Sequence, residues 1–265
     1  MEARCPNRET CFERGNITFL ILGDVCTRNC RFCGVSKGKP REVDTDEPSR
    51  IAKAIEELNS RHIVITSVTR DDLPDGGASH FVRVAEEVKR RNPDIILELL
   101  VPDFQGDTTS LETLFTAPFE IFGHNLETVP RLYSTVRPMA DYQRSLRVLA
   151  CAVKAGFCTK TGLMVGCGER PSEVEEVLRT VANEGVSIVT IGQYFQPDKT
   201  SLPVREFVTD ELFSHYAEYG EEVGVRVFAG PLVRSSYIAG LTEEELTNLK
   251  EGGDLYGTSD HSQAF

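Results

Sequence analysis

From residue 17 onward, short runs of aliphatic and β-branched residues alternate with amphipathic segments. The runs are too uniformly apolar for a sheet that exposes one face to water, so they are typical of strands covered on both faces. We predict strands at Ile17–Gly23, Arg61–Val68, Asp94–Val101, Phe119–His124, Cys158–Gly166 and Val186–Gln193. Val225–Val233 is expected to add a last extended segment.

The amphipathic segments between these runs predict helices. One opens at Pro48-Ser49, where proline suits a first helical turn. Thr109 with Glu112, and Ser172 with Glu175, have the spacing of a capping box at two further helix starts. The remaining pattern places helices at Ala78–Arg91, Thr109–Thr116, Ala140–Ala155, Ser172–Glu184 and Thr209–Glu222.

Repeated strand–helix alternation predicts an α/β fold with parallel strands and right-handed crossovers. A doubly wound sheet and a complete or partial barrel both fit this pattern. No G-x-G-x-x-G follows the first strand, which weakens a dinucleotide-binding fold, and three cysteines follow it instead. In a barrel that loop lies at the C-terminal face, where active sites occur. We expect one domain without an internal linker.

Composition and charge narrow the partners. The 265 residues are 40% hydrophobic and 26% charged, as in an ordinary globular protein. The net charge of -12 argues against nucleic acid and anionic lipid as partners. No run approaches the roughly 18 apolar residues of a membrane span, and the N-terminal stretch is not apolar enough for a signal peptide. We therefore expect a cytoplasmic protein with no membrane partner.

The chain contains 8 cysteines, unevenly distributed. In a cytosolic protein, clustering near the N-terminus favours metal or redox chemistry over disulfides. Cys151, Cys158 and Cys167 lie in apolar periodic segments and are expected to be small core residues. The clustered ones are Cys5, Cys11, Cys26, Cys30 and Cys33.

The pattern C-x3-C-x2-C at Cys26, Cys30 and Cys33 places three thiolates on one compact loop. Structural zinc sites normally have four ligands, often in paired C-x2-C knuckles. Three thiolates on a four-iron cluster would leave one iron open to a small-molecule ligand. The spacing therefore favours a cluster, and a zinc site completed by Cys5, Cys11 or a histidine is the alternative.

With Phe32 before the last cysteine, this loop resembles the radical S-adenosylmethionine (SAM) superfamily. A second stretch, from Gly162 through Met164 and Gly166 to Glu169, resembles that superfamily's G-x-I-x-G-x-x-E pattern. The resemblance implies a partial (β/α)6 TIM-like barrel with an N-terminal cluster-binding extension. The open iron would bind the amino and carboxylate groups of SAM, with Phe32 beside the adenine.

The same resemblance implies further contacts with SAM. Gly166 would let the backbone approach the nucleoside, and Glu169 would begin the next helix. Asn125 and Glu127 would contact the ribose and the carboxylate. Weaker candidates near SAM, the acyl chain or a basic rim for the carrier are Ser67, Arg70, Asp71, Asp72, His124, Arg131, Arg137, Arg144, Lys160, Gln193, Tyr194 and Gln196. For these residues, and for Asn125 and Glu127, an ordinary salt bridge, cap or core contact is an equal alternative.

Within the superfamily, longer strings resemble the lipoyl synthase family in its own order along nearly the whole chain. They are CPNRETCFERGNITFLILGDVCTRNCRFC, TSVTRDDLPDGGASHF, FGHNLETVPRLY, GLMVG, GERPSE, IGQYFQP and GPLVRSSY. The resemblance implies insertion of two sulfur atoms into an octanoyl chain carried on a lysine of a lipoyl carrier domain. Two [4Fe-4S] clusters and SAM would be the cofactors. The implied partners are a dehydrogenase E2 subunit or a glycine cleavage H protein, and a reductant such as ferredoxin or flavodoxin.

The family's second cluster has thiolates spaced C-x4-C-x5-C and a serine ligand from R-S-S-Y. Cys5 and Cys11 match the second and third thiolates, and Ser236 is expected to be the serine, with Ser235 as the alternative. The first cysteine would fall immediately before Met1. We favour a true start upstream of Met1 over a short form with an incomplete cluster.

The expected organisation has three parts. Residues 1–16 would contribute to the second cluster, residues 17–240 would form the barrel, and residues 241–265 would form a C-terminal helix and acidic tail. Two competing interpretations remain at this level. One is a different radical SAM enzyme that inserts sulfur into another substrate, and the other is a degenerate relative that binds iron–sulfur or zinc without catalysis.

Overall fold

The structure is a computed structural model that describes residues 7, 17–58 and 60–236. Its main sheet has seven strands, all parallel, in the spatial order β1-β4-β5-β6-β7-β8-β9. The strands are β1 Ile17–Ile21, β4 His62–Ser67, β5 Ile96–Leu100, β6 Ile121–Gly123, β7 Cys158–Val165, β8 Ile188–Gln193 and β9 Arg226–Gly230. Each predicted strand contains one of these, and the extended segment at 225–233 is confirmed as β9.

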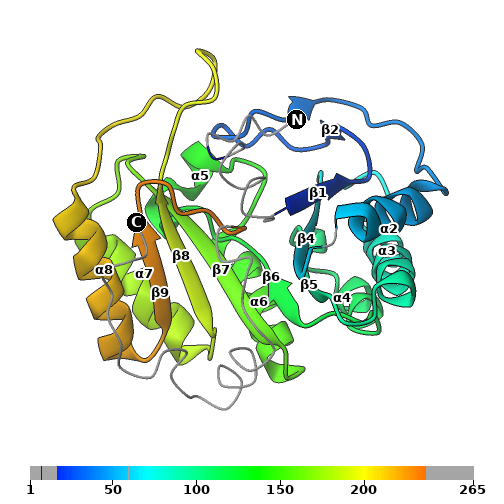
Figure 1. The fold of residues 1–265 in the computed structure, drawn as a ribbon. Coiled ribbons are helices and arrows are strands. Elements are labelled where there is room, and N and C mark those ends of the chain that lie inside the picture. The colour runs from blue at the N-terminus through cyan, green and yellow to red at the C-terminus, as the bar shows by residue number, and fades with distance from the viewer. Residues whose placement is uncertain (1–6, 8–16, 59, 237–265) are drawn as a thin grey trace.

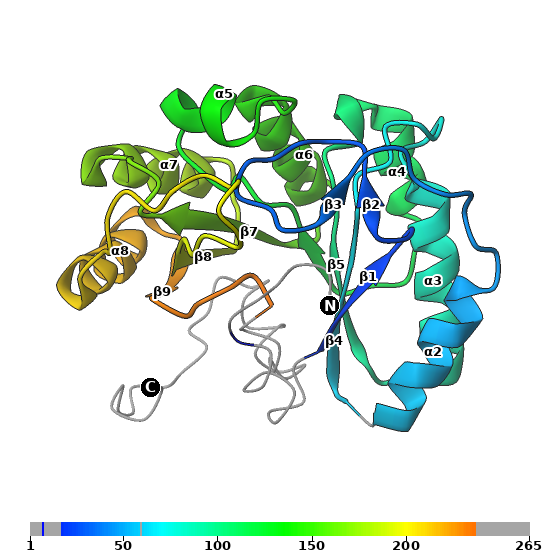
Figure 2. The same cartoon turned by 90° about the horizontal axis from the view of Figure 1, so that it is seen from above.

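The strand order decides between the two architectures that fit the sequence. Because consecutive strands are neighbours, every right-handed crossover puts its helix on the same face of the sheet. Figures 1 and 2 show the helices around the outside of a curved sheet. The helices are α2 Glu47–Leu58, α3 Ala78–Arg91, α4 Thr108–Leu114, α6 Tyr142–Lys154, α7 Pro171–Asn183 and α8 Asp210–Val223. The partial barrel is confirmed, and in the described residues no ladder joins β1 to β9.

Short elements near the cysteines and above the sheet were not predicted. They contain too few residues to show a hydrophobic period. The strand pair β2 Val25–Cys26 and β3 Ser36–Lys37 flanks the cysteine motif. The others are η1 Phe104–Gly106, η2 Pro130–Leu132 and α5 Tyr133–Val136.

Neither predicted capping box forms, and in each case the observed N-cap residue lies two residues earlier. The carboxylate of Asp107 caps α4 and accepts a hydrogen bond from the Ser110 N–H at 2.8 Å. At α7 the box lies two residues earlier, where Glu173 accepts from the Arg170 N–H at 2.8 Å. At α4, Asp107 is a better N-cap residue than the predicted Thr109. At α7, Pro171 in the first turn sets where the helix begins.

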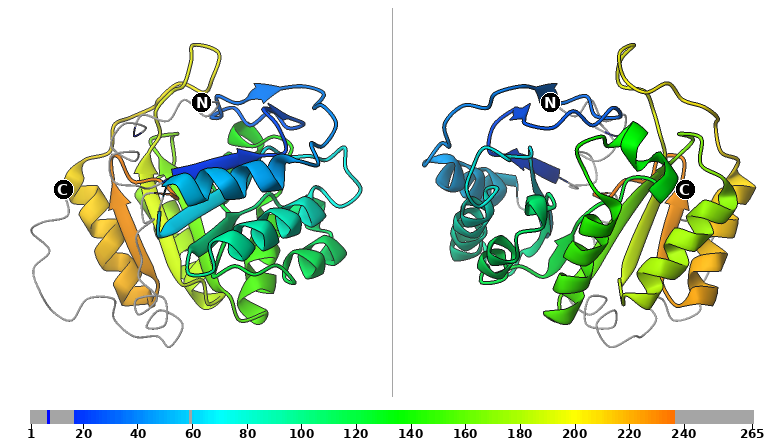
Figure 3. Two further views of the ribbon diagram at one scale, coloured as in Figure 1. Left: turned by 45° about the vertical axis from the view of Figure 1, so that its right-hand side comes forward. Right: turned by 180° about the vertical axis from the view of Figure 1, so that it is seen from behind.

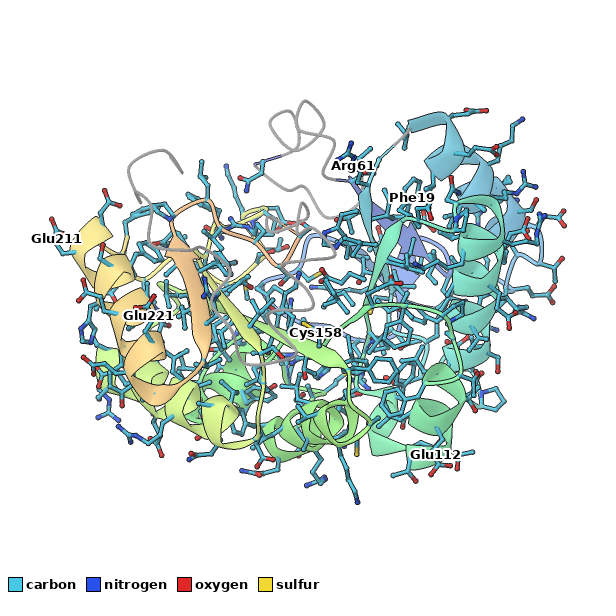
Figure 4. All side chains as sticks on the ribbon, turned by 60° about the horizontal axis from the view of Figure 1, so that its bottom comes forward. Phe19, Arg61, Glu112, Cys158, Glu211 and Glu221 are labelled. Atoms are coloured by element: carbon cyan, nitrogen blue, oxygen red, sulfur yellow. The ribbon has the colours of Figure 1, made fainter. Side chains whose placement is uncertain are left out.

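The sheet buries different side chains on its two faces. The outward face supplies fully buried residues such as Ile63, Leu97 and Val189, which pack against the helices in the main core. The inward face holds a smaller apolar cluster of Ile96, Ile121, Cys158 and Ile188. In Figure 4 the label of Cys158 lies on β7, between the helices of the two halves of the barrel.

The expectation that three cysteines are core residues is confirmed for Cys158 and Cys167, which are buried. Cys151 is only half-buried on α6, although it packs against the main core. No helix in the described part of the chain combines the length and apolarity that a bilayer crossing requires.

Glycines on the inward face of β7 and β8 admit a distant segment into the barrel. A Cβ at Gly192 would lie 2.0 Å from the Val233 carbonyl oxygen, and one at Gly162 would lie 2.7 Å from Ser235 Oγ. Residues 233–236, which follow the last strand, therefore lie against the inner face, where only glycine leaves room. This places the serine pair of the R-S-S-Y motif next to the open end of the barrel.

We expect Gly192→Ala to lower the free energy of unfolding by about 1–3 kcal/mol, because a methyl group would overlap backbone rather than a movable side chain. Gly230→Ala is the matched control on the adjacent strand, since its Cβ would meet only the Val233 side chain at 3.3 Å. Equilibrium denaturant unfolding of both variants measures the difference. Equal effects would show that the backbone at 233 does not constrain Gly192.

Candidate functional site

The loop that carries Cys26, Cys30 and Cys33 crosses the mouth of the barrel, where the strands end. Its backbone is attached to the loops after three other strands: Thr27 N–H donates to Thr69 O at 3.0 Å, and Arg31 N–H donates to Val136 O at 2.9 Å. Arg31 O in turn accepts from Leu202 N–H at 2.7 Å. Figure 1 shows this blue segment above the strand ends, and Figure 3 shows it from two further sides. The loop is therefore held by most of the barrel rim.

Arg28, between the first two cysteines of the motif, is the side chain that anchors the loop. It is buried and donates from Nε and Nη2 to the two oxygens of Asp71, both at 2.8 Å. Nη2 also donates to Asp103 Oδ1 at 2.6 Å, and Arg144 Nη1 lies 3.4 Å from the other oxygen. Burial alone would raise the pKa of Asp103, but the hydrogen bonds from Arg28 lower it to about 2. The network fixes three loops around one guanidinium.

The three thiols fit a cluster better than a single ion. Burial raises the pKa of Cys30, and it raises the pKa of Cys33 to about 11, so a bound cation is needed to hold both as thiolates. Among the described residues, no three His, Cys, Asp or Glu side chains are arranged to hold one metal ion. A four-iron cluster distributes its thiolates over several irons, so it does not require the three thiols to meet at one ion. The alternative zinc sites that use Cys5 or Cys11 lie outside the described residues.

Asn125 and Glu127 follow β6 and lie at the mouth, as expected. Glu127 has a positive φ of 69°, and its backbone bonds to β7 through Gly162 O at 2.8 Å and Met164 N at 2.9 Å. Asn125 Nδ2 donates to Glu127 Oε1 at 3.2 Å, while Asn125 Oδ1 accepts from Ser235 Oγ at 2.9 Å. Burial raises the pKa of Glu127. One amide thus connects this carboxylate with the R-S-S-Y motif.

The prediction that Arg137 belongs to the basic rim is wrong, because this residue is buried. Its Nη1 donates to Asn125 O at 2.8 Å, to Leu126 O at 3.3 Å and to Tyr133 Oη at 2.9 Å. Its charge acts to lower the pKa of Cys30, against the larger effect of burial. The guanidinium therefore lies inside the site, between the cysteine loop and Asn125.

The loop from Gly166 to Glu169 is closed by hydrogen bonds between its own residues. Glu169 is buried and accepts from the N–H groups of Gly166 at 2.5 Å and Cys167 at 3.0 Å. A Cβ at Gly166, where φ is 94°, would lie 2.2 Å from Gln193 Nε2. The helix begins at Pro171, so the expectation that Glu169 begins it is wrong. Contact of either residue with a nucleoside stays a prediction.

Phe32 is half-buried beside a small apolar cluster at the mouth, formed by Val136, Cys167, Tyr194 and Leu202. This packing fixes the ring next to the last cysteine of the loop, and its contact with adenine stays a prediction. Ser236 is half-buried two residues after the cation–π contact of Arg234 with Phe195. Cys5 and Cys11 lie outside the described residues.

Most of the weaker candidates have structural partners. Arg70 pairs with Asp72 at 2.8 Å, and Asp71 with Arg28. Arg131 pairs with Glu173 at 2.7 Å. The side chains of Gln193, Tyr194 and Gln196 hydrogen-bond the backbone of their own loop, at Glu206, Leu202 and Ser201 respectively. These contacts favour the structural alternative.

Two of those candidates lie deeper than expected. Lys160 is buried inside the barrel and bonds Glu98 at 2.5 Å, so it does not face the mouth. His124 is buried with Nδ1 bonded to Val101 O at 2.8 Å, and burial lowers its pKa to about 4. It is the core histidine expected as its alternative role, although Nε2 has no partner in the described residues.

Sequence reasoning missed the contribution of Arg28 and Asp103. Arg28 stands inside the cysteine motif and Asp103 follows the third predicted strand, so both positions were visible. Charge alone does not identify a partner 75 residues away. Only the parallel order of the strands brings the two loops together.

Comparison with known proteins shows the family of this chain. A model of the radical SAM superfamily matches residues 20–181. Lipoyl synthase from Caldicellulosiruptor saccharolyticus is 52% identical over 251 residues, covering 94% of this chain and 87% of its own. The chain belongs to the lipoyl synthase family. Lipoyl synthase from Leptospira interrogans is 48% identical over 238 residues, covering 89% of this chain and 79% of its own.

Solved structures of low identity share the fold of this lipoyl synthase family member. Streptococcus suis SuiB bound to S-adenosylmethionine superposes with a TM-score of 0.66 at 10% identity, covering 83% of this chain and 53% of SuiB. Methylornithine synthase superposes with a TM-score of 0.57 at 12% identity, covering 92% of this chain and 87% of its own. The partial barrel is thus the radical SAM fold.

We expect Arg28→Lys to lower the free energy of unfolding by about 3 kcal/mol and to reduce iron bound after reconstitution, because lysine leaves buried carboxylate oxygens unpaired. Arg50→Lys is the control, since Arg50 pairs with Asp44 in the open and its loss should cost less than about 1 kcal/mol. Denaturant unfolding and iron analysis measure both effects. Normal iron content in Arg28→Lys would show that the anchor does not govern the loop.

Proposed function

We propose that the chain inserts two sulfur atoms into an octanoyl chain attached to a lysine of a lipoyl carrier domain, forming the lipoyl group. The observation that carries this proposal is the convergence of the C-x3-C-x2-C loop, Asn125, Glu127 and the R-S-S-Y motif at one barrel mouth. When bound, the reduced cluster and SAM supply the radical chemistry that removes hydrogen from unactivated C–H bonds. The protein contributes positioning and the exclusion of water.

The proposal assigns particular residues of this chain to each cofactor. Cys26, Cys30 and Cys33 hold the SAM-binding cluster, and Cys5, Cys11 and Ser236 belong to the second one. Phe32, Asn125, Glu127, Gly166 and Glu169 surround SAM. The buried Arg137 beside Cys30 supports this assignment, because a positive charge favours anionic ligands where water is excluded.

The partners follow from the same proposal. A dehydrogenase E2 subunit or a glycine cleavage H protein presents the octanoyl-lysine, and a ferredoxin or flavodoxin supplies electrons. Of the described residues, 17–58 and 60–236 form the barrel; the predicted roles of residues 1–16 in the second cluster and of residues 241–265 as a C-terminal helix and tail fall outside the described residues. A cytoplasmic location agrees with these partners.

The decisive test is the product mass after one anaerobic turnover. The protein is reconstituted with iron and sulfide and mixed with SAM, a reductant and an octanoyl-lysine peptide. We expect a dithiolated peptide together with 5′-deoxyadenosine, and Cys30→Ala should form neither because one cluster ligand is missing. An unchanged peptide in the presence of 5′-deoxyadenosine would contradict sulfur insertion while preserving the SAM site.

Alanine substitutions at the two serines of the R-S-S-Y motif are expected to affect product formation differently. Ser235 Oγ is already bonded to Asn125, whereas the described residues offer Ser236 no hydrogen bond, which supports Ser236 as the ligand. We expect Ser236→Ala to cleave SAM without forming dithiolated peptide. Ser235→Ala should reduce product less than about tenfold, since it loses one hydrogen bond worth roughly 1 kcal/mol. Product and 5′-deoxyadenosine yields are compared for both, and the reverse pattern would assign the ligand to Ser235.

A further inference from the structure

Three ionisable side chains lie buried in the interior of the barrel, away from the cysteine loop. His62 on β4, Glu98 on β5 and Lys160 on β7 are 3%, 0% and 1% exposed. Glu98 Oε2 is 2.5 Å from Lys160 Nζ and 3.5 Å from His62 Nε2. We call these three residues the ionic floor. No step of the proposed reaction uses it.

The floor lies one inward-facing layer below the site. Lys160 precedes Gly162 by two residues on β7, which is about 6.6 Å along a strand. A Cβ at Gly162 would lie 2.7 Å from Ser235 Oγ and 2.9 Å from Asn125 Oδ1. The Asn125–Ser235 contact therefore lies against Gly162, which is the next residue after Lys160 on the inward face of β7.

Glu98 faces the same interior. A Cβ at Gly123, on the neighbouring strand, would lie 3.4 Å from Glu98 Oε1, and this oxygen has no hydrogen-bond partner among the described residues. Two residues beyond Gly123 along the chain is Asn125, at the site. The apolar cluster of Ile96, Ile121, Cys158 and Ile188 lies toward the other end of the barrel. The floor therefore separates the site from the apolar interior.

We infer that the ionic floor sets the maximum length of the acyl chain. The inference rests on the proposed function, which brings an acyl chain into the barrel mouth with its far end at the site. A longer chain must extend past the Asn125–Ser235 layer, where it meets paired charges instead of apolar side chains. Separating a buried ion pair costs more free energy than the burial of a few methylene groups contributes, so a longer acyl chain does not displace the ionic floor.

The test compares chain lengths on the holoprotein with SAM and without reductant. Calorimetric titration measures the binding of peptides that carry octanoyl-, decanoyl- or dodecanoyl-lysine. We expect wild type to bind the decanoyl peptide at least about tenfold more weakly than the octanoyl peptide. In the double variant Glu98→Leu/Lys160→Met the two should differ by less than about threefold, because both charges are removed together and neither is left buried alone.

The matched control is Glu98→Gln/Lys160→Gln, which keeps a polar floor of similar size and should keep the wild-type ratio. Thermal unfolding verifies that each variant is folded, and Glu98→Gln/Lys160→Met replaces the first double variant if that one is not. Equal affinity of wild type for both peptides, or an unchanged ratio in the folded apolar variant, would overturn the inference. Failure of wild type to thiolate the octanoyl peptide would instead overturn the proposed function.

Discussion

The buried guanidinium of Arg28 is the interaction on which the site depends. It lies between Cys26 and Cys30, and it is paired with Asp71 and Asp103 from the loops after the next two strands of the sheet. A buried charge is tolerated only when its partners satisfy it, so the loop has one well-defined position. The same pairing keeps the Asp103 carboxylate ionised, since hydrogen bonds from Arg28 lower its pKa to about 2. The thiols are thereby placed by charges that do not themselves ligate.

The strand order explains why such distant residues meet. Consecutive parallel strands bring all their carboxyl ends to one rim, so loops from residue 26 to residue 202 share a mouth. Glycine at 162 and 192 then opens the inner face of β7 and β8 to the segment that follows β9. Asn125 contacts both the Glu127 carboxylate and Ser235 there. Two motifs 110 residues apart in the sequence thus become one hydrogen-bonded unit.

The sequence predicted the strands and helices because burial on both faces leaves predominantly apolar runs, such as Ile96–Leu100. It did not predict the short elements around Cys26, which have no hydrophobic period, or the true N-caps at Asp107 and Arg170. The cysteine loop was predicted at the mouth because it follows the first strand, and Asn125 was predicted there through resemblance. The positions predicted for Arg137 and Lys160 at the mouth or rim are wrong, because a sequence shows that a residue is cationic but not whether the fold buries it.

Those two cations illustrate how the barrel uses burial in opposite ways. Lys160 has a carboxylate within 2.5 Å, so its charge is neutralised locally and contributes little field at the mouth. Arg137 is bonded by carbonyls and a phenol, and the described residues show no carboxylate in salt-bridge contact with it. Its charge is therefore left to act on its surroundings, where it opposes the rise in the pKa of Cys30. The interior thus pairs one cation with a carboxylate below the site, and it hydrogen-bonds another to neutral oxygens within the site, where the positive charge lies beside Cys30.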